Sequence, residues 1–206
     1  MPESPFTVSD VMTHTVIAVG RDASFKEIVG LIDQWKVSAL PVLEGEGRVI
    51  GVVSEADLLP KEEFRDTDEG DPAEWAKAGG VTAGELMSTP AVTVHADASL
   101  AEAARIMARR HVKRLPVVDG IGILQGVVSR SDLLKVFLRG DEEIAEEIRH
   151  GVLDRLPVLT ELEVSVSEGV VVLSGSLPDR TLVPVVARAI RAVEGVVDIR
   201  LDLTHR

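Results

Sequence analysis

The sequence contains no cysteine, which excludes disulfide bonds, thiolate metal sites and cysteine nucleophiles together. It also contains no run of about 18 consecutive apolar residues, and its first residues, MPESPFTVSDVM, include neither a basic start nor an apolar segment. We therefore expect a cytoplasmic protein that is not anchored in a membrane. The 206 residues are 45% hydrophobic, so the chain can bury its cores without covalent links.

Positive charge is scarce, because 22 lysines and arginines face 34 aspartates and glutamates and the net charge is −12. Binding to nucleic acid needs clustered cations, so we expect no nucleic-acid partner. The distribution is uneven: residues 81–139 carry +3, whereas residues 1–59, 60–80 and 140–206 carry −5, −4 and −6. A small anionic ligand is therefore expected to prefer the basic segment.

An internal repeat organises the first two thirds of the chain. Residues 11–59 align without a gap to residues 86–134, and 19 of the 49 aligned positions are identical. Average residue usage would give roughly 3 identities by chance. A single copy of about 50 residues buries too little surface to be stable alone. We therefore expect the copies to pack around a pseudo-two-fold axis and to form paired clefts.

Each copy predicts the element order β-α-β-β-α, a mixed α/β fold. Apolar runs at Val16–Val19 and Ala91–Val94 predict buried strands, and the Ser-x-x-Glu boxes at 24–27 and 99–102 predict helix starts. The expected core faces of these helices are Phe25, Ile28, Val29 and Ile32 in the first copy, and Leu100, Ala103, Ala104 and Met107 in the second. The segments LPVL and LPVV, a glycine turn, and VIGVVS or LQGVVS then predict a β-hairpin.

Both copies contain L-P-V-[LV]-x-G followed by G-V-V-S-x-x-D-L-L. Over residues 8–137 the chain therefore resembles a tandem of CBS domains, often called a Bateman module. The resemblance implies repeats at 8–59 and 81–137, joined by an acidic linker at 60–80. In such families the cleft between the copies binds adenosine derivatives, and the modules commonly dimerise. It thus implies AMP, ADP or ATP as a regulatory ligand, a homodimer through the CBS pair, and no required metal.

The resemblance also implies the binding residues, since the family's serine and aspartate hold phosphate and ribose and the residues around Leu-Pro line the base. In the second copy these are Ala91, Val92, His111, Lys113, Arg114, Leu115, Pro116, Ser129, Arg130 and Asp132. In the first copy they are Val16, Ile17, Ser38, Ala39, Leu40, Pro41, Ser54 and Asp57. A carboxylate can accept hydrogen bonds from both ribose hydroxyls, and a helix N-terminus can hold phosphate.

The two copies differ in charge at the implied site. The cations His111, Lys113, Arg114 and Arg130 of the second copy align with Lys36, Ser38, Ala39 and Glu55 of the first. We expect Ser129, Asp132 and these cations to meet in one phosphate-competent crevice, and the other crevice to bind neutral ligands, bind weakly or stay empty. Asp132→Ala should then weaken nucleotide binding more than Asp57→Ala.

Simpler interpretations of the same residues stay open. Ser-x-x-Asp also fits a generic helix cap, which needs no ligand. Lys113 and Arg114 could be solvated surface charges, and His111 an ordinary exposed histidine. Pro41 and Pro116 could serve only to bend the start of a strand. Residues 60–80 are rich in acids and turn formers, so they predict a surface connection.

Residues 141–204 predict a second domain with the order α-β-β-α-β. The expected elements are a helix at 141–153, a hairpin that turns at Glu168-Gly169, a helix capped by Thr181 and ended by Gly195, and a strand with Val197, Ile199, Leu201 and Leu203 on one face. GVVVLSGSL and EGVVDIRLDL resemble the BON domain of bacterial envelope-stress proteins. That family is often proposed to contact phospholipid, but this segment is acidic, so we expect a protein partner and no membrane binding.

The leading hypothesis is a regulatory sensor that binds an adenine nucleotide and changes conformation or assembly. The alternative is a ligand-free interaction scaffold of a stress response, with protein or lipid contact through the BON-like domain. The sequence contains no nucleophile with a partnered base, no Walker loop and no cluster among its five histidines, so we expect no enzyme activity. These patterns do not distinguish AMP, ADP and ATP from S-adenosylmethionine.

Overall fold

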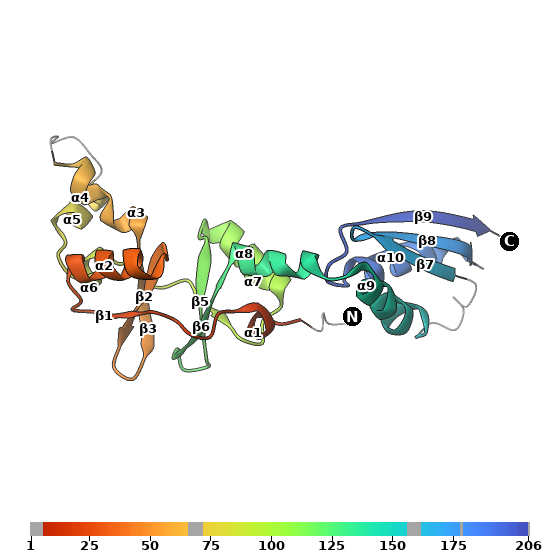
Figure 1. Ribbon diagram of the computed structural model, residues 1–206, viewed down its shortest axis with the longest axis horizontal. Helices are drawn as coiled ribbons and strands as arrows, with labels where there is room; N and C mark the ends of the chain where they lie inside the picture. The colour runs from red at the N-terminus through yellow and green to blue at the C-terminus, as the bar shows by residue number, and fades with distance from the viewer. Residues whose placement is uncertain (1–5, 66–71, 156–161, 178, 206) are drawn as a thin grey trace. The chain divides into compact units, whose positions relative to one another are not determined.

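The chain forms two compact units in the computed structural model, which describes residues 6–65, 72–155, 162–177 and 179–205. The repeat unit is Val8–Arg130, and the C-terminal unit is Ser131–Arg206 together with Phe6 and Thr7. Figure 1 labels the elements of both units along the chain. Each unit has its own buried core and is described separately below.

The repeat unit contains the two aligned copies, each with a three-stranded sheet. Its elements are α1 (Val8–Val11), β1 (Val19–Gly20), α2 (Phe25–Trp35), β2 (Ala39–Glu44), β3 (Arg48–Ser54), α3 (Glu55–Leu58), α4 (Pro60–Glu63), α5 (Pro72–Gly79), α6 (Ala83–Leu86), β4 (Val94–His95), α7 (Leu100–Arg110), β5 (Arg114–Val118) and β6 (Leu124–Ser129). The sheet orders are β1-β2-β3 and β4-β5-β6, with a parallel first pair and an antiparallel second pair in both. The helix that follows the last strand is α3 in the first copy and α8 (Arg130–Leu134), which continues into the C-terminal unit, in the second. The predicted element order is therefore confirmed.

The first strand of each copy is shorter and later than predicted. The ladder begins only at Val19, paired with Val42, and at Val94, paired with Val117. The residues before these pairs are half-buried but have no strand partner, so their apolar character reflects packing rather than sheet pairing. The predicted strand starts at Val16 and Ala91 are therefore wrong by three residues.

The serine caps of the two long helices lie where the sequence predicts them. The Ser24 hydroxyl accepts from the N–H of Glu27 at 3.3 Å, and the Ser99 hydroxyl accepts from the N–H of Glu102 at 3.2 Å. A cap satisfies backbone donors that have no partner inside the helix. On the core face, Ile28 is 0% exposed, but Val29 is 41% exposed and its predicted core position is wrong. Ala104 is also exposed rather than buried.

Reciprocal contacts relate the two copies. Thr13 bridges Val127 on β6, and Ser88 bridges Val52 on β3, at positions that the repeat makes equivalent. The bridge between Arg48 and Ile123 joins two residues that are equivalent to each other, as a two-fold axis requires. The entry segment of each copy thus completes the outer strand of the other copy, which is the expected pseudo-two-fold packing.

The connection between the copies is more structured than the sequence predicts. It contains α4 and α5, whereas its acids and turn formers predict only a surface connection. The rings of Phe64 and Trp75 lie 5.0 Å apart between their centroids. Lys61 donates to the carbonyl oxygen of Ala78 at 2.8 Å, so the end of α5 is held against α4.

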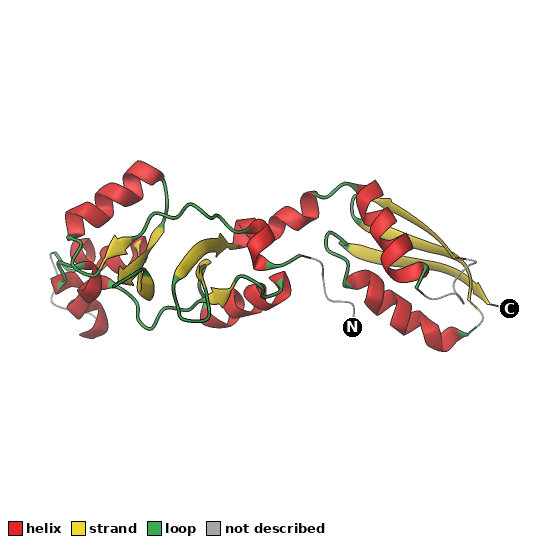
Figure 2. Cartoon of the chain, turned by 90° about the horizontal axis from the view of Figure 1, so that it is seen from below, coloured by secondary structure: helices red, strands yellow, loops and turns green. Residues whose placement is uncertain are grey.

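The C-terminal unit has the predicted α-β-β-α-β order. Its elements are α8 (Arg130–Leu134), η1 (Lys135–Leu138), α9 (Asp141–Ile148), the π-helical η2 (Arg149–Leu153), β7 (Leu162–Ser167), β8 (Val170–Leu177), η4 (Arg180–Leu182), α10 (Val183–Arg191) and β9 (Asp198–His205). The sheet order is β7-β8-β9, and both long helices lie on one face of it (Figure 2). Glu168 and Gly169, with φ of 49° and 72°, form the predicted hairpin turn.

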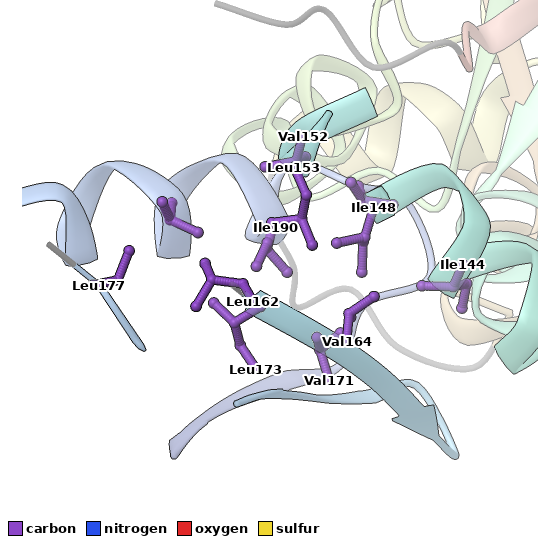
Figure 3. Close-up of a cluster of buried hydrophobic side chains, with 12 residues drawn as sticks. Ile144, Ile148, Val152, Leu153, Leu162, Val164, Val171, Leu173, Leu177 and Ile190 are labelled. Carbon is purple, nitrogen blue, oxygen red and sulfur yellow. The ribbon is translucent and has the colours of Figure 1, made fainter. Parts of the chain in front are cut away.

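The core of the C-terminal unit lies between these helices and the sheet. Figure 3 shows Ile148 of α9 and Ile190 of α10 directed toward Leu162 and Val164 of β7 and Leu173 of β8. Ile148, Ile190 and Leu173 are all 0% exposed. Alternating apolar residues on β7 and β8 therefore supply the buried face, as the sequence predicts.

Two details of the C-terminal unit differ from the prediction. Thr181 does not cap α10, because a 3₁₀ turn comes first and the Thr181 hydroxyl donates to Asp179 instead, at 2.7 Å. Val197 precedes β9 and is 61% exposed, and Leu201 within β9 is 42% exposed, so neither belongs to the core face of the strand. Ile199 and Leu203 do pack against the core. Pro184 is tolerated in the first turn of α10, where its missing N–H leaves no hydrogen bond unmade.

Candidate functional site

A pocket of about 270 Å³ lies between the two copies of the repeat unit. It is slightly smaller than the roughly 300–1,000 Å³ that is usual for ligand sites. Its lining consists of Ser38, Ala39, Val52, Ser54, Glu55, Ala56, Asp57, Ser88, Pro90, Ala91, Val92, His111, Val112, Lys113 and Arg114. We call it the inter-copy pocket, since the first seven residues belong to the first copy and the others come from the start and the middle of the second.

The acidic side of the pocket lies where β3 passes into α3. The Asp57 carboxylate is buried, with the residue 6% exposed, and accepts from the N–H of Ser54 at 2.8 Å and from its hydroxyl at 2.6 Å. These bonds confirm the helix-cap interpretation for the first copy. The other carboxylate oxygen accepts from the Ser88 hydroxyl at 3.0 Å and from the Lys77 ammonium. Asp57 is therefore a fixed acceptor in the wall of a pocket.

The cationic side of the pocket comes from the second copy. His111 ends α7 in the left-handed conformation, with φ of 55°, and this turn directs the following residues into the pocket. The Arg114 guanidinium donates to the Ser38 hydroxyl at 2.7 Å, across the boundary between the copies. Among the described residues, no carboxylate forms an ion pair with His111, Lys113 or Arg114. This wall can therefore offer its charge to an anion.

Arg130 does not line the pocket, but it contacts the backbone of the residues that form this wall. Its guanidinium donates to the carbonyl oxygen of Val112 at 3.1 Å, and its N–H donates to that of Lys113 at 3.1 Å. Both bonds fix the backbone that carries Lys113. Ala39, Val52, Pro90 and Val92 provide apolar surface between the acidic and the cationic sides. The pocket thus combines an apolar region, two carboxylates (Glu55 and Asp57) and two permanent cations (Lys113 and Arg114).

The structure groups the predicted residues differently from the sequence. The lining includes Ser38, Ala39, Ser54, Asp57, Ala91, Val92, His111, Lys113 and Arg114 from the predicted set. The cations of the second copy meet Ser54 and Asp57 of the first, where we expected Ser129 and Asp132. The reason is the two-fold packing, which places the end of β3 opposite the residues that follow α7.

The other predicted residues lie outside the lining. Leu40 and Leu115 are 0% exposed in β2 and β5, and Pro41 and Pro116 are also buried in these strands. Val16 and Ile17 are half-buried before β1. Ser129 ends β6, opposite Arg114 in the strand register. In the C-terminal unit, Asp132 accepts from Lys135 at 2.7 Å.

Sequence reasoning missed Ser88 and Lys77, the two donors that complete the shell around Asp57. Ser88 lies near the start of the second copy. It could not be assigned to the site from sequence, because the bridge that places it beside Val52 of the first copy depends on the two-fold packing. Lys77 lies in the segment PAEWAKAG, which has a proline at a helix start and an acid in the first turn. These are helix-start signals, so the helix that carries Lys77 was detectable from sequence.

Among the described residues, no helix is long and apolar enough to span a bilayer. The same part of the chain contains no group of three or more histidine, aspartate or glutamate residues arranged to hold a metal ion.

The known families that match this chain cover the two copies of the repeat and the C-terminal segment separately. The model of the family described as "CBS domain" matches residues 8–61 and 83–139, and that of the "BON domain" matches residues 140–205. Together the two CBS segments cover more than half of the chain.

Individual relatives are similar over about two thirds of the chain. The uncharacterized protein MJ1404 of Methanocaldococcus jannaschii is 32% identical over 152 residues, covering 71% of this chain and 36% of that protein. The chloroplastic CBS domain-containing protein CBSX2 of Arabidopsis thaliana is 28% identical over 153 residues, covering 65% of this chain and 64% of its own length. The chain thus spans less than two thirds of both relatives.

Solved structures of CBS pairs have the same fold. The structure of CBSX2 in complex with AMP has a TM-score of 0.59 and 29% identity, covering 65% of this chain and 97% of the other. The CBS domain pair of MJ0100, in complex with 5-methylthioadenosine and S-adenosyl-L-methionine, has a TM-score of 0.54 and 20% identity, covering 64% and 95%. At that identity the second similarity concerns the fold alone.

Proposed function

Since this chain belongs to the family of CBS-domain proteins and carries a BON domain after its CBS pair, we propose that it is a regulatory protein whose inter-copy pocket binds an adenine nucleotide. The observation that carries this proposal is the meeting of Asp57 from one copy with Lys113 and Arg114 from the other. A carboxylate suits ribose hydroxyls and paired cations suit phosphate. The apolar surface between them suits a flat base.

The lining contains two acids, Glu55 and Asp57, and two cations, so its formal charges balance. Its cationic side, where a phosphate would lie, favours AMP, ADP or ATP over S-adenosylmethionine. Lys113 and Arg114 attract phosphate oxygens, and a second negative charge would strengthen this attraction. The sulfonium group of S-adenosylmethionine is positive and would be repelled by the same side chains. The similar CBSX2 structure contains AMP, which supports a phosphorylated ligand. Regulation then requires that the ligand bind two conformations or assemblies with different affinities.

Calorimetric titration with AMP, ADP, ATP, adenosine and S-adenosylmethionine tests the proposal. AMP should bind more tightly than adenosine, and a ligand at 100 times its Kd should add about 2.7 kcal/mol to the free energy of unfolding. The double variant Lys113→Ala/Arg114→Ala should lose roughly tenfold or more in AMP affinity and little in adenosine affinity. Arg110→Ala is the matched control, because Arg110 is an exposed cation of α7 outside the pocket lining. Equal losses for AMP and adenosine would contradict a phosphate role for these cations.

A comparison of Asp57→Asn with Asp132→Asn tests which acid serves the ligand. Because Asp57 lines the pocket that contains the cations, its substitution should weaken AMP binding by about tenfold or more, and Asp132→Asn should have the smaller effect. This order is the reverse of the one expected from sequence. A larger effect at Asp132 would instead restore the sequence-based assignment of the phosphate-binding crevice.

An interaction scaffold is the second candidate function. Its support is the exposure of large apolar side chains in the C-terminal unit, since Phe137 is 50%, Leu138 83% and Val185 57% exposed. Contiguous exposed apolar patches often mark contact with another protein, and Phe137 and Leu138 are adjacent residues of η1. A homodimer through the CBS pair and a protein partner of the BON domain belong to this proposal. Unchanged melting with every nucleotide, together with concentration-dependent sedimentation, would favour the scaffold over the sensor.

A further inference from the structure

The shell around Asp57 is complete before any ligand binds. One carboxylate oxygen accepts from the N–H and the hydroxyl of Ser54, and the other accepts from the Ser88 hydroxyl and the Lys77 ammonium. A carboxylate offers about four lone-pair sites. All of them are therefore engaged, and a ribose hydroxyl can reach this acceptor only if one of the present donors leaves.

Lys77 is the donor that can leave with the least disturbance. Ser54 and Ser88 are fixed by backbone bridges to Ala39 and Val52. Lys77 comes from α5, a helix in which no residue is buried. Its side chain is 29% exposed, so a released ammonium can return to water.

Few contacts hold α5 in place. They include the hydrogen bond from Lys61 to Ala78, the ring contact between Phe64 and Trp75, and the ion pair of Lys77 itself. Segments with few buried apolar contacts open at low free-energy cost. The ion pair between Lys77 and Asp57 is thus a substantial part of what docks α5.

We infer that Lys77, which reaches Asp57 from beside the inter-copy pocket and not from its lining, takes the hydrogen-bonding position on Asp57 that a ribose hydroxyl would use, and that a nucleotide entering the pocket displaces Lys77 and releases α5. This inference rests on the proposed nucleotide site. Ribose and Lys77 compete for one carboxylate oxygen, so occupancy of the pocket is coupled to the docking of the linker helix. Binding in the pocket therefore changes the surface of the connection between the two copies. By linkage, anything that holds α5 in its docked position lowers the affinity for nucleotide.

The first test removes the competing ammonium while keeping an unbranched apolar side chain. Lys77→Met should raise the affinity for AMP by about tenfold, because a hydrogen bond to a charged group no longer opposes binding. The affinity for 2′,3′-dideoxy-AMP, which lacks the hydroxyls that compete with Lys77, should change much less. Lys26→Met, in an exposed lysine of α2, is the matched control and should leave both affinities unchanged.

The second test follows α5 directly. The chain has two tryptophans, so Trp35→Phe leaves Trp75 of α5 as the single fluorophore. Saturating AMP should shift its emission to longer wavelength as the contact with Phe64 is lost. In the Trp35→Phe/Lys77→Met variant, the ligand-free emission should already be shifted, and AMP should add little.

The outcomes separate the two proposals. AMP binding by calorimetry with unchanged affinity in Lys77→Met and unmoved Trp75 emission would overturn the displacement of Lys77 and leave the nucleotide site standing. A lower AMP affinity in Lys77→Met would also overturn it, since Lys77 would then assist the ligand. Absence of binding for every nucleotide would overturn the proposed function and this inference together.

Discussion

Gly126 of β6 packs directly against Met12 of the other copy, at a distance that leaves no room for a side chain. A methyl group at Gly126 would lie 2.7 Å from the Met12 sulfur and 2.9 Å from the carbonyl oxygen of Thr13. The methionine could rotate away, but the carbonyl belongs to the bridge between Thr13 and Val127. The repeat places Gly51 and Met87 in the same relationship.

Gly126→Ala should therefore destabilise the repeat unit by about 1–3 kcal/mol, the usual cost of overpacking. The cause is steric, since Gly126 does not need a positive φ. Thermal or urea denaturation measures the loss. Gly120→Ala is the control, because a methyl group there meets nothing within 4 Å, and it should change stability by no more than about 0.5 kcal/mol. Equal stability of the two variants would contradict the close approach.

A second prediction concerns Arg139, which joins the parts of the C-terminal unit. Its guanidinium forms ion pairs with Glu143 at 2.7 Å and with Glu147 at 2.8 Å. It also donates to the carbonyl oxygen of Glu194 at 2.8 Å and lies 4.9 Å from the centre of the Phe6 ring. Burial of this side chain lowers the pKa of Arg139, but its hydrogen bonds to the two glutamates outweigh burial and raise it overall. Arg139 is therefore both charged and enclosed.

Arg139→Ala should lower the free energy of unfolding of the C-terminal unit by about 1–3 kcal/mol, because it leaves a carbonyl and two carboxylates without their shared donor. The matched control is Arg149→Ala, whose ion pair with Glu142 is largely exposed and should contribute less than about 1 kcal/mol. Urea denaturation followed by circular dichroism compares the variants. A loss at Arg149 as large as that at Arg139 would show that enclosure does not strengthen the contacts.

A third prediction concerns the acid stability of the repeat unit. The N–H groups of Val81 and Thr82 donate to Glu85 at 2.9 Å and 3.1 Å, and these bonds hold the pKa of Glu85 below its ordinary value of 4.5. A carboxyl group whose pKa is lower in the folded state stabilises the fold above the unfolded pKa. That contribution is lost as the pH falls through the folded pKa.

Glu85→Ala should therefore lower the Tm near neutral pH, and its difference from the wild type should shrink as the pH falls through and below 4.5. Melting curves across this range provide the measurement. Glu46→Ala, in the exposed turn between β2 and β3, serves as the control and should follow the wild type throughout. A Glu85→Ala difference that is independent of pH would contradict the assignment to the carboxylate charge.

The fold was largely predictable from sequence because its strongest signals are local or repeated. The serine caps at Ser24 and Ser99, the alternation along β7 and β8 and the turn at Glu168-Gly169 each depend on a few neighbouring residues. The errors occur where tertiary packing, and not the local sequence, determines whether a side chain is buried. Val29 lies on the predicted apolar face, but it is exposed because the helix buries only a narrow stripe around Ile28.

The sequence predicted many of the residues that form the site, but it did not predict which of them lie in the same pocket. Nine predicted residues line the inter-copy pocket, yet aligned copies gave no information on which acid faces which cations. That pairing depends on the two-fold packing, which exchanges partners between the copies. Lys77 was missed for a related reason: its contact with Asp57 spans 20 residues of chain and depends on where α5 docks.

The crossed bridges at Thr13–Val127 and Ser88–Val52 also determine how the repeat unit can be divided. Cutting the chain between α4 and α5 and separating the halves would expose edge strands whose backbone hydrogen bonds are now supplied by the other half. Exposed edges of this kind pair readily with another chain. An isolated half should therefore recover the lost pairing by joining a second identical half, because each half carries both the entry segment and the outer strand that the bridges require.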